Sequence, residues 1–151
     1  MVQELLDQRA IEQVFVRYFD RVDAKDHEGA AALFAEDCEF DIMTGQVVLG
    51  RERYARLLRA VLAQYGATSH AVSNFLIRVD GDVAHSVAYV HAVHRMVEDG
   101  RIWQLWARIE DDLERRDEGW VVTRHTLHGV DSEPAWDAIP NKWYGGHPAI
   151  S

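Results

Sequence analysis

The sequence contains few cysteines and few basic residues for its size. Its 151 residues include one cysteine, Cys38, and 16 basic residues against 25 acidic ones. One cysteine cannot form a disulfide within the chain, and a formal net charge of −9 disfavours binding to nucleic acid or anionic lipid. No apolar run is long enough to cross a bilayer, and no cationic stretch followed by an apolar one resembles a secretory signal. We therefore expect a cytoplasmic protein whose partners include neither nucleic acid nor membrane.

Motifs for nucleotides, metals and serine nucleophiles are also missing. The chain has no glycine-rich phosphate loop and no nucleophile elbow. Two histidine pairs, His91 with His94 and His125 with His128, are spaced by three residues within predicted strands. An offset of three places two side chains on opposite faces of a strand, which is unsuited to a shared metal ion. We therefore expect no metal site and no cofactor.

Hydrophobic residues make up 48% of the chain, enough for one globular domain spanning residues 1–151. The clearest pattern is an amphipathic helix over residues 3–23. Asp23 lies on its apolar face, four residues after Phe19, whereas Asp20 lies on the polar face. A carboxylate in this position needs a partner, because an unpaired buried charge is costly. The other residues of the apolar face are Ile11, Phe15, Tyr18 and Val22.

Two further helices are predicted in the first half. Asp26 can cap a short helix that runs to about Ala35. A short strand is expected over residues 39–42. Apolar residues spaced by three and four then predict a helix over residues 54–65, with Gly66 as its stop signal.

The second half predicts a sheet. Asp80-Gly81, Asp99-Gly100 and Glu118-Gly119 separate β-rich runs, and such dipeptides favour hairpin turns. We expect long antiparallel strands over residues 68–79, 83–98, 101–116 and 120–130. Strands of this length must twist and coil. The predicted fold is α+β: a curled, cone-shaped sheet whose concave face is covered by three N-terminal helices, leaving a pocket between the two layers.

Residues 131–151 form a tail rich in proline and tryptophan. All three prolines of the chain fall in it, together with Trp136, Trp143 and Tyr144. Because so much aromatic surface is poorly suited to solvent, we expect the tail to pack against its own domain or against a neighbouring subunit.

His70 is the predicted partner of Asp23. A carboxylate bound to one ring nitrogen of a histidine fixes its tautomer and leaves the other nitrogen free to act as a base. The alternative is that Asp23 caps the following turn and His70 satisfies a backbone group. A separation of 47 residues does not by itself decide between these interpretations.

A family resemblance favours the pair. Residues 18–26, 68–74 and 119–122, within the order of helices followed by a curled sheet, resemble the SnoaL-like branch of the nuclear transport factor 2 superfamily. This branch includes scytalone dehydratase, hexachlorocyclohexane dehydrochlorinase and the bile-acid dehydratases. In these enzymes an aspartate at the end of the first helix pairs with a histidine that opens the first long strand. The resemblance assigns these roles to Asp23 and His70, and implies a homodimer or homotrimer.

Six other residues are candidates for binding a substrate. If β alternation is regular, Asn74 shares a face with His70, where it either binds substrate oxygen or bonds across the sheet. Each tyrosine candidate is either a hydroxyl donor to the substrate or a core aromatic residue. Arg124 and His128, on the last strand, either reach the pocket or lie exposed or at a subunit contact. The tyrosine candidates are Tyr18, Tyr54 and Tyr89.

The leading hypothesis is a cofactor-independent lyase of the dehydratase type. His70 would remove a proton from a small, mostly apolar substrate, cyclic or resembling a polyketide or steroid, and Asp23 would orient His70 and stabilise its charged form. An isomerase or an aldol-type cyclase starts with the same step. A non-catalytic module for ligand binding or association is the alternative from a different functional class.

Overall fold

The computed structural model describes residues 1–135 and shows three helices and one six-stranded sheet. The strand order is β2-β1-β6-β5-β4-β3, in which β1 and β6 are parallel and all other neighbours are antiparallel. None of the helices in this part of the chain is long and apolar enough to span a membrane. The elements are α1 (Val2–Asp23), α2 (His27–Ala31), β1 (Phe34–Ile42), β2 (Val48–Leu49), α3 (Arg51–Leu62), β3 (Tyr65–Asp80), β4 (Val83–Met96), β5 (Ile102–Arg116) and β6 (Gly119–Glu133).

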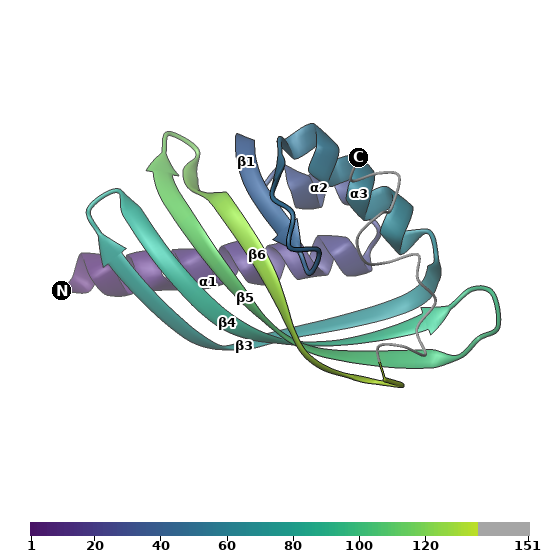
Figure 1. Cartoon of the computed structure of the whole chain (residues 1–151). Helices are drawn as coiled ribbons and strands as arrows, with labels where there is room; N and C mark the ends of the chain where they lie inside the picture. Colours follow the sequence, from purple (N-terminus) through teal and green to yellow (C-terminus); the bar gives the residue numbers. More distant parts are fainter. Residues whose placement is uncertain (136–151) are drawn as a thin grey trace.

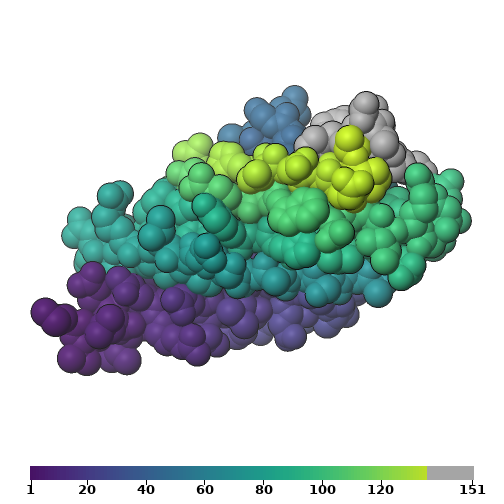
Figure 2. Space-filling view, turned by 90° about the horizontal axis from the view of Figure 1, so that it is seen from below, coloured from purple at the N-terminus to yellow at the C-terminus, as the bar shows by residue number. Residues whose placement is uncertain are grey.

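The predicted faces of the first helix are confirmed. All four apolar residues named with Phe19 are buried on α1, and Asp20 is exposed. One acid on the buried face, Asp7, binds Arg115 of β5 through both carboxylate oxygens at 2.8 Å. This bidentate ion pair ties the start of α1 to the sheet. Figure 2 shows α1, in purple, lying along the β3 edge of the sheet.

The second and third helices differ from the predicted ranges. Asp26 caps α2 by accepting a hydrogen bond from the Gly29 backbone at 3.0 Å, as predicted. The helix is shorter than expected, because β1 starts at Phe34 to pair with β6. Likewise α3 ends at Leu62, and Gly66 lies inside β3 and is not a helix stop. Tertiary pairing with neighbouring strands overrides the local helical pattern at both ends.

The three predicted hairpins are present. Gly81, Gly100 and Gly119 stand at the turns with positive φ angles of 61°, 72° and 110°. Glycine adopts such angles without steric cost, so these positions set where each strand reverses. The four long strands differ from the predicted ranges by a few residues at most, and β6 continues to Glu133, into the segment predicted as a tail. The short strand predicted over residues 39–42 begins earlier, at Phe34, and β2 was not predicted.

Among the register shifts in the sheet, two decide whether predicted site residues face inward. On β3 the pairing with β4 shifts between Ser73 and Leu76, where Asn74 has a φ of 57°. On β6 the pairing with β5 shifts so that Thr123 is an extra residue between Val122 and Arg124. Each β-bulge inserts one residue and exchanges the inward and outward positions of the rest of the strand.

The curled sheet and the helices enclose a cavity. Figure 1 shows the long strands β3, β4 and β5 bending along their length, with α1 crossing behind them and α2 and α3 grouped at one end. The inward residues of β4 include Ala84, Ala88 and Ala92, whose small side chains leave space between the layers. The predicted packing of Trp136, Trp143 and Tyr144 concerns residues outside the described part of the chain.

Candidate active site

Asp23 and His70 form a hydrogen-bonded pair at the meeting point of α1 and β3. Nδ1 of His70 lies 2.7 Å from Oδ1 of Asp23. The His70 backbone N–H donates to the other carboxylate oxygen at 3.0 Å, and the Thr68 hydroxyl donates to Oδ1 at 2.9 Å. Partial burial raises the pKa of the Asp23 carboxyl, but the hydrogen bonds from His70 and Thr68 outweigh it and hold the pKa below its usual value. Asp23 is therefore an ionised partner that fixes the ring of His70.

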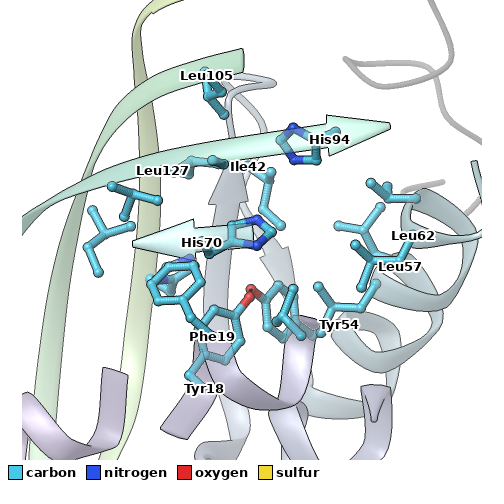
Figure 3. Close-up of a pocket in the computed structure, with 17 residues that line it drawn as sticks. Tyr18, Phe19, Ile42, Tyr54, Leu57, Leu62, His70, His94, Leu105 and Leu127 are labelled. Carbon is cyan, nitrogen blue, oxygen red and sulfur yellow. Dashed lines mark hydrogen bonds between the residues drawn. The ribbon is translucent and has the colours of Figure 1, made fainter. Parts of the chain in front are cut away.

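The His70 ring faces the cavity. Phe19 stacks on it with ring centroids 5.3 Å apart, and His94 meets it edge-on at 5.3 Å. Burial lowers the pKa of His94 to about 3, so His94 is uncharged beside His70. Figure 3 shows His70 directed into a space bounded by Leu57, Leu62 and other apolar side chains. The centres of water molecules can occupy about 70 Å³ of this cavity.

Tyr18 and Tyr54, two of the predicted tyrosines, line the same cavity. Their hydroxyl groups bond to each other, from α1 and α3 respectively, and their oxygens are drawn close together in Figure 3. Burial raises the pKa of both hydroxyls, so both are uncharged. Because both side chains are buried, they also belong to the core, and the two interpretations of these tyrosines are compatible.

The other four predicted substrate-binding residues do not line this cavity. Asn74 is exposed, because the bulge on β3 turns it outward and brings Phe75 inward instead. Tyr89 is 49% exposed on the outer face of β4. Arg124 and His128 are exposed on β6, where they lie 3.9 Å and 3.2 Å from carboxylate oxygens of Glu39 and Glu110. The inward positions predicted for Arg124 and His128 assumed regular alternation of side chains from Trp120, and the extra residue Thr123 breaks this alternation.

Three buried polar residues near the cavity were not predicted as site residues. His94 and His125 line the cavity, and Asp111 binds His125. Regular alternation along β4 was sufficient to place His94 with Val90 and Ala92. The position of His125 requires knowledge of the bulge, and no local sequence signal marks it.

Asp111 and His125 form a second aspartate–histidine pair. They occupy facing positions on β5 and β6, and Oδ1 of Asp111 lies 2.6 Å from Nδ1 of His125. The side chains are 0% and 3% exposed. Burial raises the pKa of the Asp111 carboxyl above its usual value, and the charge and hydrogen bond of His125 offset only part of this effect.

The arrangement is suited to proton transfer within an apolar space. Three imidazole rings, of which those of His70 and His125 are held by carboxylates, and two uncharged hydroxyl groups are the main polar groups that line it. Within residues 1–135, no three histidine, cysteine or acidic side chains are grouped in a way that could hold a metal ion.

Comparison with known proteins agrees with this architecture. A model of the SnoaL-like domain matches residues 3–126. An uncharacterised protein of Mycobacterium tuberculosis is 30% identical over 129 residues, which cover 82% of this chain and 85% of that protein.

Solved structures extend the likeness to enzymes. A scytalone dehydratase-like protein from Novosphingobium aromaticivorans is 29% identical, with a TM-score of 0.81 over 87% of this chain and 90% of that one. A hexachlorocyclohexane dehydrochlorinase has the same fold at 22% identity, with a TM-score of 0.79 and the same coverage. A nuclear transport factor 2-like protein from the same Novosphingobium species also shares the fold, with a TM-score of 0.73 at 23% identity over 86% of each chain. The chain therefore belongs to the SnoaL-like domain family.

Proposed function

We propose that the protein is a lyase that eliminates water from a small, mostly apolar molecule, with His70 as the general base. The observation that carries this proposal is the 2.7 Å contact between His70 Nδ1 and Asp23 Oδ1, at the wall of an apolar cavity. With Nδ1 donating to the carboxylate, the lone pair of the neutral imidazole is on Nε2. Nε2 is then the atom that accepts a proton from the substrate.

The reaction begins at a carbon next to a carbonyl group. His70 takes the proton from this carbon and becomes an imidazolium, which the Asp23 carboxylate stabilises. The electrons of the broken C–H bond form a carbon–carbon double bond, and the leaving oxygen departs with the electron pair of its C–O bond. The likeness to a scytalone dehydratase-like protein supports a dehydratase over other lyases.

The direct test is a screen of cyclic β-hydroxy ketones, read by mass spectrometry as loss of one water. We expect wild-type protein to convert at least one of them, and His70→Gln to lower the rate by roughly 10²- to 10⁴-fold, because glutamine cannot accept the proton. Asp20→Asn, at an exposed position on α1, is the matched control and should leave turnover unchanged. Full activity of His70→Gln contradicts the proposal.

The same screen separates elimination from related reactions. Incorporation of deuterium next to the carbonyl without loss of water would indicate an isomerase or a cyclase, since both start with the same proton transfer. Binding without any exchange would indicate a non-catalytic module. Either of these two results would contradict the proposed elimination and identify the activity that replaces it.

We further propose that the protein forms a homo-oligomer through the outer face of the sheet. This face carries exposed apolar side chains, including Leu76 at 74%, Tyr89 at 49% and Trp106 at 39% exposed. Contiguous apolar surface of this kind is typical of association surfaces. Sedimentation of wild type and of Trp106→Asp tests this assignment; a monomeric wild type contradicts it.

A further inference from the structure

The second aspartate–histidine pair has no role in proton removal by His70. His125 lines the same cavity, yet its partner Asp111 is fully buried. This pair lies on β5 and β6, whereas Asp23 and His70 lie on α1 and β3. The side chains around the ring come from four elements: Tyr18 of α1, Phe34 of β1, Tyr54 of α3 and Asp111 of β5.

Burial limits the charge that this pair can carry. If Asp111 were ionised and His125 neutral, the interior would contain an uncompensated negative charge, which is costly. Two arrangements avoid it without leaving a buried hydrogen unbonded: an ionised carboxylate with an imidazolium, or a carboxyl protonated on Oδ1 that donates to Nδ1. A hydrogen on Oδ2 instead would have no acceptor, because Oδ2 has no hydrogen-bond partner within residues 1–135. Nε2 of His125 carries a hydrogen in both arrangements.

The aromatic side chains packed around the His125 ring add no charge to the pair. The ring centroids of Phe34, Tyr18 and Tyr54 lie 5.3, 6.0 and 6.0 Å from that of His125. The two tyrosine hydroxyls are uncharged, and the charges that act on Asp111 from the outer face are Asp112 and His85, which have opposite signs when His85 is protonated.

The pair of Asp23 and His70 differs from this one in its exposure to solvent. The Asp23 side chain is 28% exposed and its carboxylate accepts three hydrogen bonds, so it is stable as an anion without a protonated partner. Pairs of titratable groups whose environments shift their pKa values apart often divide the acid and base roles of an active site. Here the partly exposed pair of Asp23 and His70, the open pair, suits the base. The fully buried pair of Asp111 and His125, the sealed pair, suits the acid.

We propose that His125, positioned by Asp111, is the general acid of the reaction and binds the oxygen that leaves the substrate. This proposal rests on the elimination proposed for His70. As the C–O bond breaks, its electron pair stays on the oxygen, which takes the proton from Nε2 of His125 and leaves as water. The pair is then an ionised Asp111 and a His125 with its remaining hydrogen on Nδ1. Exchange with water afterwards returns a proton to His125 and removes one from His70.

The proposal also defines the substrate class. The molecule has an acidic C–H bond for His70 and, on the adjacent carbon, a hydroxyl group for His125. The rest of it is apolar, because aliphatic side chains form much of the wall of the cavity that the two histidines also line. Among these are Ile42, Leu57, Leu105, Ile109 and Leu127.

One test uses the wild-type protein alone. Nitrogen-15 NMR distinguishes protonated from unprotonated imidazole nitrogens. At about pH 7.5, where an ordinary histidine is mostly neutral and shares one hydrogen between its two nitrogens, we expect Nε2 of His125 to be fully protonated. An unprotonated Nε2 at this pH overturns the proposal, without any need for a variant to fold or for a substrate to be known.

The second test varies the leaving group, with hydroxyindanone (a β-hydroxy ketone) and its acetate ester as probes. Acetate is a weak base and leaves without a proton, whereas hydroxide needs one. We expect His125→Gln to lower water elimination about 100-fold or more and acetate elimination less than about threefold. Equal losses with both probes, or no loss with either, overturn the proposal.

His70→Gln separates this proposal from the one on which it rests. It should slow both eliminations, because both need the base. If it slows neither while His125→Gln still slows only the loss of water, the proposed base is wrong and the assignment of His125 stands. Circular dichroism of each variant confirms that the fold is retained.

Discussion

The two aspartate–histidine pairs contain the same chemical groups at nearly the same separation, 2.7 Å and 2.6 Å, but in different surroundings. Asp23, at a helix end, is partly exposed and bonded to Thr68 and to the His70 backbone as well as to the ring. Asp111, in the middle of a strand, is fully buried, and its second oxygen has no hydrogen bond within residues 1–135. The pKa of Asp23 is lowered, whereas that of Asp111 is raised. In both pairs the histidine lowers the pKa of the carboxyl group, and the greater burial of Asp111 is what raises its pKa above the usual value.

The largest expected difference between the pairs is in stability. Asp111→Ala removes one partner of a sealed pair and leaves His125 without its partner, which should cost about 3–5 kcal/mol of unfolding free energy. Asp23→Ala should cost less, about 1–3 kcal/mol, because solvent can reach the groups it leaves unpaired. Urea denaturation of both variants measures the two values. Equal costs would show that the two pairs do not differ in burial as described.

The double variant sharpens this comparison. Removing both Asp111 and His125 leaves no unpaired charge, so the two alanine substitutions together should destabilise by less than the sum of the single ones. Strict additivity would contradict a direct interaction between the two side chains.

A second difference concerns catalysis. Asp23→Asn keeps the shape of the side chain but removes the charge that stabilises protonated His70, so turnover should fall about 100-fold while substrate affinity changes little. The control Asp20→Asn, one turn earlier on the exposed face, should be silent. Steady-state kinetics on the hydroxyindanone probe provide both values; equal damage from the two variants would refute the role given to Asp23.

A third difference is the sign of the pH dependence of stability. The lowered pKa of Asp23 means that its contribution is complete above about pH 4 and is lost as the pH falls through its folded-state value. The raised pKa of Asp111 means the reverse: its contribution is complete below about pH 4 and is lost as the pH rises through its folded-state value.

Stability measurements on Asp23→Asn and Asp111→Asn at several pH values test these signs. As the pH falls below about 4, the advantage of wild type over Asp23→Asn should shrink. Between neutral pH and pH 4, acidification should favour wild type over Asp111→Asn. Parallel curves for the two variants would remove the distinction between the pairs.

The smallest expected effect comes from a single donor. Thr68→Val has nearly the same shape but loses the 2.9 Å hydrogen bond to Asp23. We expect turnover to fall roughly fivefold, which corresponds to about 1 kcal/mol in activation free energy, because the two hydrogen bonds from His70 to Asp23 remain. A loss as large as that of Asp23→Asn would mean that Thr68, more than His70, positions the carboxylate.

Sequence reasoning predicted the open pair and did not predict the sealed one. The helical period places Asp23 with Phe19, and the family resemblance points to the histidine that opens the first long strand, so the two together lead to His70. Tyr18 and Tyr54 follow from the same helical periods. These signals lie within short stretches of chain.

The sealed pair depends on interactions that no short stretch contains. Asp111 and His125 meet because two strands pair in one register, and His125 faces inward because Thr123 is an extra residue in its strand. The same shift turns Arg124 outward. Neither a bulge nor a pairing register is encoded by local periodicity, so the alternation counted from Trp120 assigned the wrong face.

The bulges at Asn74 and Thr123 have a consequence for how sequences of this family are aligned. Loss of one codon at either position would exchange the solvent side and the cavity side for the remainder of the strand. A related chain with a regular strand would need a one-residue gap at that point for its inward residues to match these. Without that gap, an alignment would place Arg124 in the column of a cavity residue and His125 in that of a surface residue.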